Sequence, residues 1–217
     1  MSVAENIQRI KGELPSHVEL VAVSKTRPVA NLMEAYDAGQ RIFGENKILE
    51  MTEKQQQMPK DVSWHMIGHV QTNKVKTMAP YVDLVHGVDT FKVLAEINKQ
   101  ALKNNRLINC LLQVHVATEE TKFGFNANEL EDLLESEEYI ALTNIKVKGL
   151  MGMATFTEDE DIIRQEFSFL KNLYDHYSER HDFTILSMGM SSDYKIAIEC
   201  GSNMVRIGSS IFGERNY

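Results

Sequence analysis

The chain has 217 residues, with 23 lysine and arginine residues against 31 aspartate and glutamate residues, and so a formal net charge of −8. With 43% hydrophobic and 25% charged residues, it has the composition of a globular chain that can bury a sizeable core. The acidic balance argues against nucleic acid or an anionic membrane as partner, and no apolar run reaches the length of a membrane span. The two cysteines have no metal-type spacing and no signal peptide is present, so we expect reduced thiols and a cytoplasmic protein.

Helix and strand patterns alternate from the start of the chain. Ser2 and Glu5 form a capping-box pattern, which predicts an N-terminal helix. The apolar run 18–24 predicts a buried strand, and a helix begins at Pro28 and ends at Gly39. Further strands are predicted at 41–43, 64–67, 84–88, 110–116, 147–151, 184–188 and 204–207, and the clearest later helices at 91–102, 129–134 and 162–174.

Eight strands that alternate with helices predict a closed parallel barrel. Such strands pair through right-handed crossovers, and eight is the number that closes a (β/α)8 barrel. A doubly wound open sheet is the alternative, but no Gly-x-Gly-x-x-Gly follows the first strand. We therefore predict an α/β protein that is a single (β/α)8 TIM barrel domain over residues 1–217. We expect it to have an extra N-terminal helix, a short final helix and no second domain.

A lysine lies at the C-terminal tip of the first predicted strand, the end at which barrels of this kind carry their active sites. Strand residues alternate in direction, so Val21, Val23 and Lys25 share a face. If the valines point into the barrel, Lys25 points into its mouth. Partial desolvation there lowers the pKa of a lysine and makes its amine a nucleophile towards aldehydes. A surface lysine is the alternative for a residue considered alone.

The last two predicted strands place further polar groups near this lysine. Strand eight neighbours strand one in a closed barrel, so Arg206 would lie close to Lys25, and Gly208 and Ser209 follow at once. Ser191 opens the helix after the seventh strand. Barrels often bind phosphate with the loops after strands seven and eight. A reactive lysine beside these loops predicts a phosphorylated aldehyde as ligand, although each glycine–serine turn alone could be ordinary.

Seven short motifs follow one another between Leu20 and Gly213: V-A-V-S-K-T-R-P, F-G-E-N, W-H-M-I-G-H-V-Q-T-N-K, T-K-F-G-F, G-L-M-G-M, L-S-M-G-M-S-S-D and M-V-R-I-G-S-S-I-F-G. Together they resemble the pyridoxal phosphate homeostasis family of the YggS/PROSC type. The resemblance implies a fold-type III barrel that binds pyridoxal 5′-phosphate (PLP), similar to the N-terminal domain of alanine racemase and lacking that enzyme's second domain. It also implies Lys25 as the Schiff-base lysine, Arg206 as the partner of the pyridine nitrogen, Asn46 near the ring, and Ser191, Gly208 and Ser209 as the phosphate-binding residues.

Two histidines and one further lysine are less informative. His65 and His69 are four residues apart, a zinc spacing on a helix, but their context, S-W-H-M-I-G, predicts a strand, so we expect a structural histidine and no metal site. His69 stands where many relatives have proline or serine, and Ser209 where many have threonine, which also carries a hydroxyl. Lys122, in T-K-F-G-F, could contact a substrate carboxylate or be an ordinary loop lysine. The sequence leaves the roles of His69 and Lys122 open.

The residue expected to contact the pyridine nitrogen, Arg206, bears on whether the protein is an enzyme. Arginine cannot accept a proton, so Arg206 would leave the ring nitrogen unprotonated and weaken the ring as an electron sink. Racemases of this type take a second base from a second domain, which we do not expect here. We therefore expect a protein that stores, buffers or delivers PLP rather than one with robust turnover. Its expected partners are PLP and apo PLP-dependent enzymes, and it is a monomer or else a dimer. A minimal PLP-dependent racemase or transaminase-like enzyme, or a Schiff-base aldolase for sugar phosphates, is the alternative.

Overall fold

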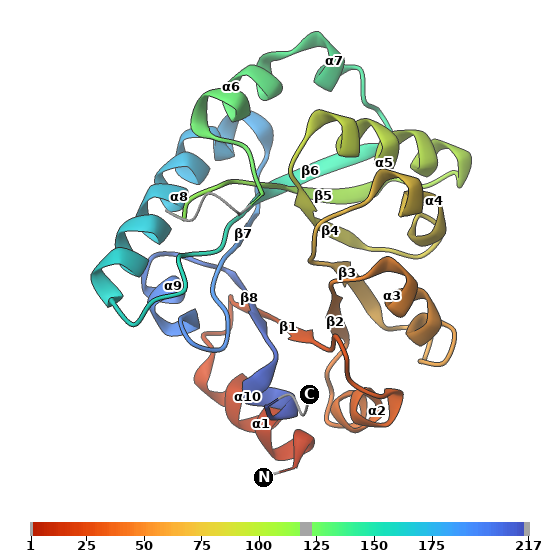
Figure 1. Cartoon of the computed structure of the whole chain (residues 1–217), viewed down its shortest axis with the longest axis vertical. Helices are drawn as coiled ribbons and strands as arrows, with labels where there is room; N and C mark the ends of the chain where they lie inside the picture. Colours follow the sequence, from red (N-terminus) through yellow and green to blue (C-terminus); the bar gives the residue numbers. More distant parts are fainter. Residues whose placement is uncertain (1, 118–122, 215–217) are drawn as a thin grey trace.

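Every apolar run that predicts a strand contributes to one, and the eight strands close into a parallel barrel in chain order (Figure 1). The computed structural model describes residues 2–117 and 123–214. The strands are β1 (Glu19–Val23), β2 (Ile42–Glu45), β3 (Ser63–Met66), β4 (Leu84–Val88), β5 (Ile108–Gln113), β6 (Ile145–Met151), β7 (Ile185–Ser187) and β8 (Met204–Ile207).

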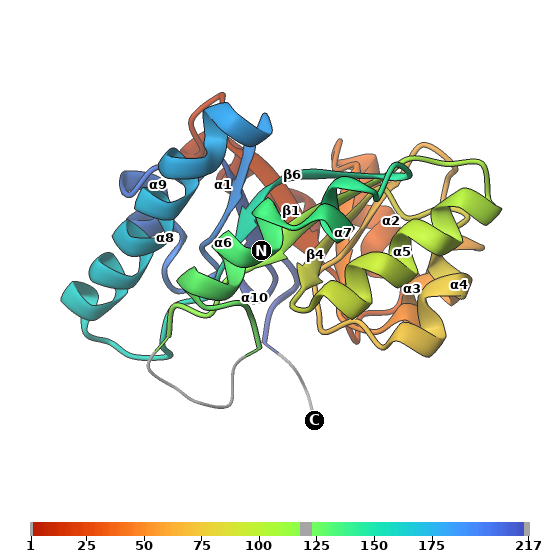
Figure 2. The ribbon, with the colours of Figure 1, turned by 90° about the horizontal axis from the view of Figure 1, so that it is seen from above.

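Helices connect the strands and surround the barrel. They are α1 (Val3–Glu13), α2 (Val29–Asp37), α3 (Ile48–Gln55), the 3-10 helix η1 (Thr72–Lys74), α4 (Val75–Met78), α5 (Phe91–Lys103), α6 (Ala127–Glu135), α7 (Glu137–Ile140), α8 (Glu160–His181), α9 (Tyr194–Glu199) and α10 (Ser209–Phe212). Seen from above, α8 and α9 lie on one side of the strands and α3 to α5 on the other (Figure 2). The predicted barrel with an additional N-terminal helix is confirmed.

The pairing of β1 with β8 closes the barrel. Glu19 lies opposite Met204, and Val21 opposite Arg206. Because β1 also pairs with β2, it has a neighbour on each side, as no edge strand of an open sheet has. The doubly wound alternative is therefore excluded.

Alternate strand residues separate into two cores. Val21, Leu84, Leu111 and Met204 belong to a cluster inside the barrel. Ala22, the next residue along β1, belongs to the larger cluster between the strands and the surrounding helices. Val21 therefore points into the barrel, which meets the condition under which Lys25, on the same strand face, would point into its mouth. Full burial of one such side chain contributes about 1.5–3 kcal/mol to the free energy of folding. A shift of the strand register by one residue, which would exchange its two faces, is therefore strongly disfavoured.

The element boundaries differ from the expected ones for local reasons. The fifth strand ends at Gln113 because the next residue, Val114, forms an isolated bridge with Phe125 beyond the sheet. Helix α8 extends beyond the predicted 162–174, since Tyr177 is buried one turn further on, and Asp182 ends the helix in a left-handed conformation with φ 54°. Pro28 is the N-cap of α2 rather than a residue of its first turn.

Helix α1 begins with the predicted capping box. The Ser2 side chain accepts a hydrogen bond from the Glu5 amide, and the Glu5 carboxylate accepts one from the Ser2 amide. The helix packs against α2 and α10, with Asn6 Nδ2 donating to the Ile211 carbonyl at 2.9 Å. Helix α1 therefore ties the start of the chain to the short final helix, beside which it lies in Figure 1.

We predict that Gly149→Ala lowers the free energy of unfolding by more than about 1 kcal/mol. Gly149, in β6, has a φ of 149°, and a Cβ there would lie 1.8 Å from the Ile185 carbonyl oxygen on β7. The two strands would have to separate to make room. Gly12→Ala in α1 is the matched control, because a Cβ there meets nothing within 4 Å. We expect this control to stabilise the protein by about 0.5–1 kcal/mol. Urea unfolding measures both, and equal midpoints for Gly149→Ala and the wild type would contradict the prediction.

Candidate functional site

A cavity of about 410 Å³ opens at the C-terminal ends of β1, β2, β7 and β8. Volumes in this range are usual for small-molecule sites. Apolar side chains, among them Val23, Ile67 and Met153, form part of its wall. The cavity brings together all six residues singled out from the sequence: Lys25, Asn46, Ser191, Arg206, Gly208 and Ser209.

A buried ion pair lies beneath the backbone that carries Lys25. Lys54 Nζ, on α3, contacts Glu45 Oε1 at 2.7 Å, and the two side chains are only 7% and 0% exposed. The same ammonium donates to the Ser24 carbonyl at 2.8 Å, while the Ser24 hydroxyl donates to Glu45 Oε1 at 2.7 Å. Burial raises the pKa of Glu45, and the Lys54 ammonium acts in the opposite direction. The peptide group just before Lys25 is therefore held by charged partners.

The peptide group just after Lys25 is held as well. The Thr26 amide donates to Glu50 Oε1, which also accepts from Lys54 Nζ at 2.7 Å. Thr26 has a φ of 64°, a left-handed conformation that is uncommon for a β-branched residue and that needs such support. Sequence reasoning missed this arrangement. Its visible signal was the spacing of Glu50 and Lys54 four residues apart on one helix face.

Arg206 lies at the base of the cavity and is only 3% exposed. Its Nη1 donates to the Ser187 carbonyl at 2.9 Å and the Ser187 hydroxyl at 2.6 Å, and its Nη2 donates to the Gly152 carbonyl at 3.0 Å. Burial lowers the pKa of Arg206 to about 10, so the guanidinium is charged at neutral pH. Within the described part of the chain, these bonds engage three of its five N–H groups, which leaves two for a ligand.

Two buried histidines continue the hydrogen bonding of Arg206 across the barrel. Ser187 Oγ lies 3.1 Å from His86 Nδ1, and His86 Nε2 lies 3.0 Å from His65 Nδ1. Burial lowers the pKa of His65 to about 3 and that of His86 well below its ordinary value, so both rings are neutral. Arginine can only donate, so the Ser187 hydroxyl accepts from it and can donate onward to His86, which in turn donates to His65.

His65 was expected to be structural, whereas the contribution of His86 was not anticipated. The available signal was position along the strands, since Leu84 and His86 share the inward face of β4. On the neighbouring strand β3, His65 has the same direction as Ile67, the residue just after the strand, which packs against the cluster inside the barrel. The described residues contain no group of three or more side chains that could hold a metal ion.

The loops after β7 and β8 are joined to each other. The Gly208 amide donates to Ser191 Oγ at 3.2 Å. Gly189, just after β7, has a φ of 98°, in the left-handed region that favours glycine, and a Cβ there would lie 2.6 Å from that of Ala197. The expectation that Ser191 opens the next helix is wrong. Helix α9 begins at Tyr194, and Ser191 lies in the turn before it, in which Asp193 Oδ1 accepts from the Met190 amide.

Two other residues considered from the sequence lie elsewhere. His69 does not line this cavity and instead contacts Asp89 in a second one. Lys122 lies outside the described residues. Across the described residues, no helix has the length and apolar character needed to cross a membrane.

Comparison with known proteins gives three consistent results. The sequence model of the family described as alanine racemase, N-terminal domain, matches residues 1–216. The pyridoxal phosphate homeostasis protein of Aquifex aeolicus is 38% identical over 221 residues, covering 99% of this chain and 96% of that protein. The structure of PipY from Synechococcus elongatus with PLP bound has a TM-score of 0.89 at 31% identity, covering 98% and 100% of the two chains.

Alanine racemase from Clostridium difficile, in complex with cycloserine, has a TM-score of 0.84 at 15% identity. The match covers all of this chain and 60% of the racemase chain, and at this identity it shows a shared fold.

We predict that His65→Gln reduces the loss of stability between pH 7 and pH 5. A histidine of the unfolded chain takes up a proton near pH 6.5, whereas folded His65, with its pKa near 3, does not. The unfolded state therefore binds more protons, and stability falls as the pH drops below about 6.5. The slope is at most about 1.4 kcal/mol per pH unit for each such histidine.

Urea unfolding at pH 7, 6 and 5 measures this slope. His17→Gln, at an exposed position, is the control and should keep the slope of the wild type. The same slope in His65→Gln as in the wild type would show that His65 is not a buried neutral group.

Proposed function

This chain belongs to the alanine racemase N-terminal domain family, and within it to the pyridoxal phosphate homeostasis proteins; from that premise we propose that it holds PLP as a Schiff base on Lys25 and acts in intracellular PLP homeostasis. The observation that carries the proposal is the single cavity that gathers a lysine, a buried arginine and two serine-bearing loops. The PLP-bound PipY structure, at 31% identity, supports the choice of ligand. We further propose that the protein is a cytoplasmic monomer, and that it stores PLP or delivers it to apo PLP-dependent enzymes.

The residues of the cavity fit the groups of PLP. Lys25 supplies the amine for the aldehyde. Arg206 has two N–H groups to offer the pyridine nitrogen, which is a hydrogen-bond acceptor when it is unprotonated. Ser191 Oγ already accepts from the Gly208 amide, so its own hydrogen can be donated to a phosphate oxygen. Ser209 adds a hydroxyl beside it, and Asn46, which directly follows β2, would lie near the ring.

The same residues favour retention of the cofactor over turnover. PLP, when bound, supplies a ring that can absorb electrons from a reacting amino acid. Arg206 remains a charged hydrogen-bond donor and cannot accept a proton from the ring nitrogen. It would therefore leave that nitrogen unprotonated, and an unprotonated ring absorbs electrons less well. The Ser187–His86–His65 chain holds Arg206 in one orientation, and the ion pair of Lys54 and Glu45 holds the backbone of Lys25. A site fixed in this way binds and orients its ligand.

We predict that borohydride reduction fixes the cofactor to the peptide that contains Lys25. The visible spectrum of the purified protein, before and after reduction, detects the Schiff base, and peptide mapping locates it. Lys25→Ala should lose the absorption, whereas Lys60→Ala, at a position outside the cavity, should keep it. Labelling of another lysine in the wild type, with Lys25 unmodified, would contradict the assignment.

We predict that Ser191→Ala and Ser209→Ala each weaken PLP binding about ten- to a hundred-and-fiftyfold without abolishing attachment to Lys25. A hydrogen bond to a charged group contributes roughly 1.5–3 kcal/mol, and the backbone amides near Gly208 remain in both variants. Equilibrium titration with PLP measures the dissociation constants. Ser168→Ala, exposed on α8, is the control. Unchanged affinity in both cavity variants would place the phosphate elsewhere.

The enzymatic alternative is tested by turnover. A panel of amino acids is incubated with the PLP-loaded protein, and racemisation and keto-acid release are measured. We expect neither at an enzymatic rate. Racemases of this fold use a second base from a second domain, and loss of one such acid–base group typically lowers a rate ~10²–10⁴-fold. Slow exchange of the Cα hydrogen without inversion is compatible with the proposal. Steady-state racemisation that Lys25→Ala abolishes would replace it with the enzyme hypothesis.

A further inference from the structure

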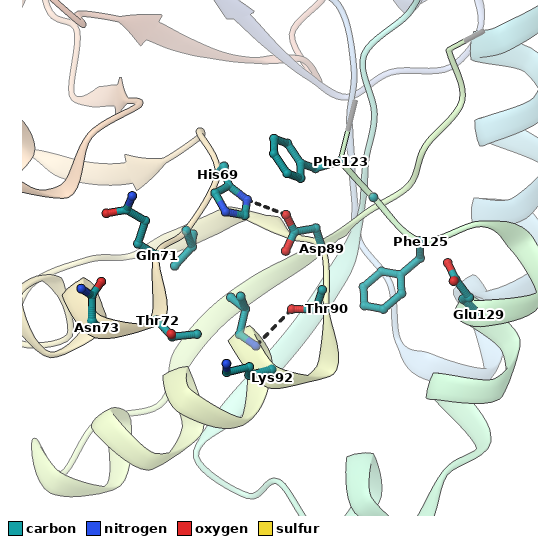
Figure 3. Close-up of a pocket in the computed structure, with 13 residues that line it drawn as sticks. His69, Gln71, Thr72, Asn73, Asp89, Thr90, Lys92, Phe123, Phe125 and Glu129 are labelled. Carbon is teal, nitrogen blue, oxygen red and sulfur yellow. Dashed lines mark hydrogen bonds and ion pairs between the residues drawn. The ribbon is translucent and has the colours of Figure 1, made fainter. Parts of the chain in front are cut away.

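A second cavity, of about 840 Å³, lies at the C-terminal ends of β3, β4 and β5 (Figure 3). Its walls come from the loop after β3, the start of α5, and the segment that leads from Phe123 into α6. It shares no lining residue with the cavity of Lys25. The proposed function leaves it without a role.

Asp89 is the buried charged group of this cavity. Its side chain is 3% exposed, and Oδ2 lies 2.7 Å from Nδ1 of His69. The other carboxylate oxygen, Oδ1, is buried and has no hydrogen-bond partner among the described residues. A buried carboxylate oxygen without a donor is costly, because it has lost water and gained nothing in exchange. Asp89 is therefore a position at which a ligand that carries N–H or O–H groups gains a strong interaction.

Two aromatic rings form an apolar wall beside Asp89. The Phe123 ring stacks on the His69 ring, with centroids 4.3 Å apart and an interplanar angle of 21°. Phe125, two residues further on, also lines the cavity. In Figure 3, the stacked rings of Phe123 and His69 lie together near the Asp89 carboxylate, to which a dashed line joins His69.

Positive groups follow Asp89 directly along the chain. Thr90 caps the 13-residue helix α5, and its hydroxyl accepts from the Val93 amide. The first-turn amides and the dipole of a helix favour an anionic group at its N-terminus. Lys92, the second residue of α5, lines the cavity as well. A negative group and a positive group of the protein thus lie within four consecutive residues.

The other carboxylate of the cavity is already committed. Glu129 Oε2 accepts from the Asn126 amide at 2.9 Å and completes the capping box of α6. Asp89 is therefore the acidic group left for a ligand among the described lining residues. An ammonium group is complementary to this carboxylate, because it carries a positive charge and N–H groups that can donate to the oxygens.

We propose that this second cavity binds a free α-amino acid as its zwitterion. The ammonium group donates to the Asp89 carboxylate, and the carboxylate of the ligand faces Lys92 and the first turn of α5. The side chain of the ligand packs against Phe123 and Phe125. Binding at this site is separate from any reaction of an amine at Lys25, and it goes beyond the holding of PLP.

Isothermal titration calorimetry of the full chain tests the proposal, with L-alanine, L-leucine and L-phenylalanine as probes. Both the cofactor-free and the PLP-loaded protein are titrated. We expect binding in both forms, and in Lys25→Ala. The matched ligands are propionate and ethylamine, which keep only the carboxylate or only the amine of alanine, and each should bind at least tenfold more weakly than alanine.

Asp89→Asn keeps the shape of the side chain and removes its charge. We expect it to weaken amino-acid binding about ten- to a hundredfold while leaving PLP binding unchanged. Asp61→Asn, at a position outside both cavities, is the control and should bind as the wild type does. Circular dichroism and PLP binding confirm that each variant is folded.

Three outcomes would overturn the second site: no binding of any probe, equal binding of ethylamine and alanine, or unchanged affinity in Asp89→Asn. A fourth outcome separates the two sites. Binding that occurs only in the PLP-loaded protein and disappears in Lys25→Ala would assign the amino acid to the cavity of Lys25. It would overturn this inference and leave the PLP-holding function intact.

Discussion

The site depends on the pairing of β1 with β8, which closes the barrel. Closure brings Lys25, two residues beyond β1, next to Gly208 and Ser209, which directly follow β8. In an open sheet of eight strands in the same order, β1 and β8 would form opposite edges about 34 Å apart, since neighbouring strands are about 4.8 Å apart. No side chain spans that distance. Lys25 and the loop of Gly208 and Ser209 therefore share a cavity only because the sheet is closed.

The interior of the barrel is divided along its axis into an apolar part and a polar part. Leu84 and Met204 pack inside it with Val21. Nearer the cavity, the inward positions of the same strands carry His86 and Arg206, and their hydrogen bonds cross the barrel. Buried polar groups stabilise a fold only when they are satisfied, and a satisfied network is rigid. This network replaces apolar packing with hydrogen bonds that hold a charged guanidinium in one orientation at the base of the cavity.

The two cavities at this end of the barrel differ in what the protein supplies. The cavity of Lys25 offers an amine and several donors, which suits a phosphorylated aldehyde. The cavity of Asp89 offers a buried carboxylate beside aromatic rings, one oxygen of which has no hydrogen-bond partner among the described residues, and this suits an ammonium group. Both are built from loops at the C-terminal ends of strands, where the scaffold is rigid and the loops are free to vary. One barrel can therefore present two different chemistries side by side.

The sequence by itself determined the number and order of the strands, and it singled out six of the residues that line the first cavity. An apolar run is a local signal, and it predicts these strands correctly because each barrel strand is buried on both faces, with one face inside the barrel and the other against the helices. The tertiary structure alone decided which distant side chains support them. His86 and Ser187 are 101 residues apart, and Glu45 meets Lys54 only because α3 folds back against β2. Their contacts depend on strand register and helix placement, and no local pattern encodes either, so Asp89 and His69 also became a site only in the folded chain.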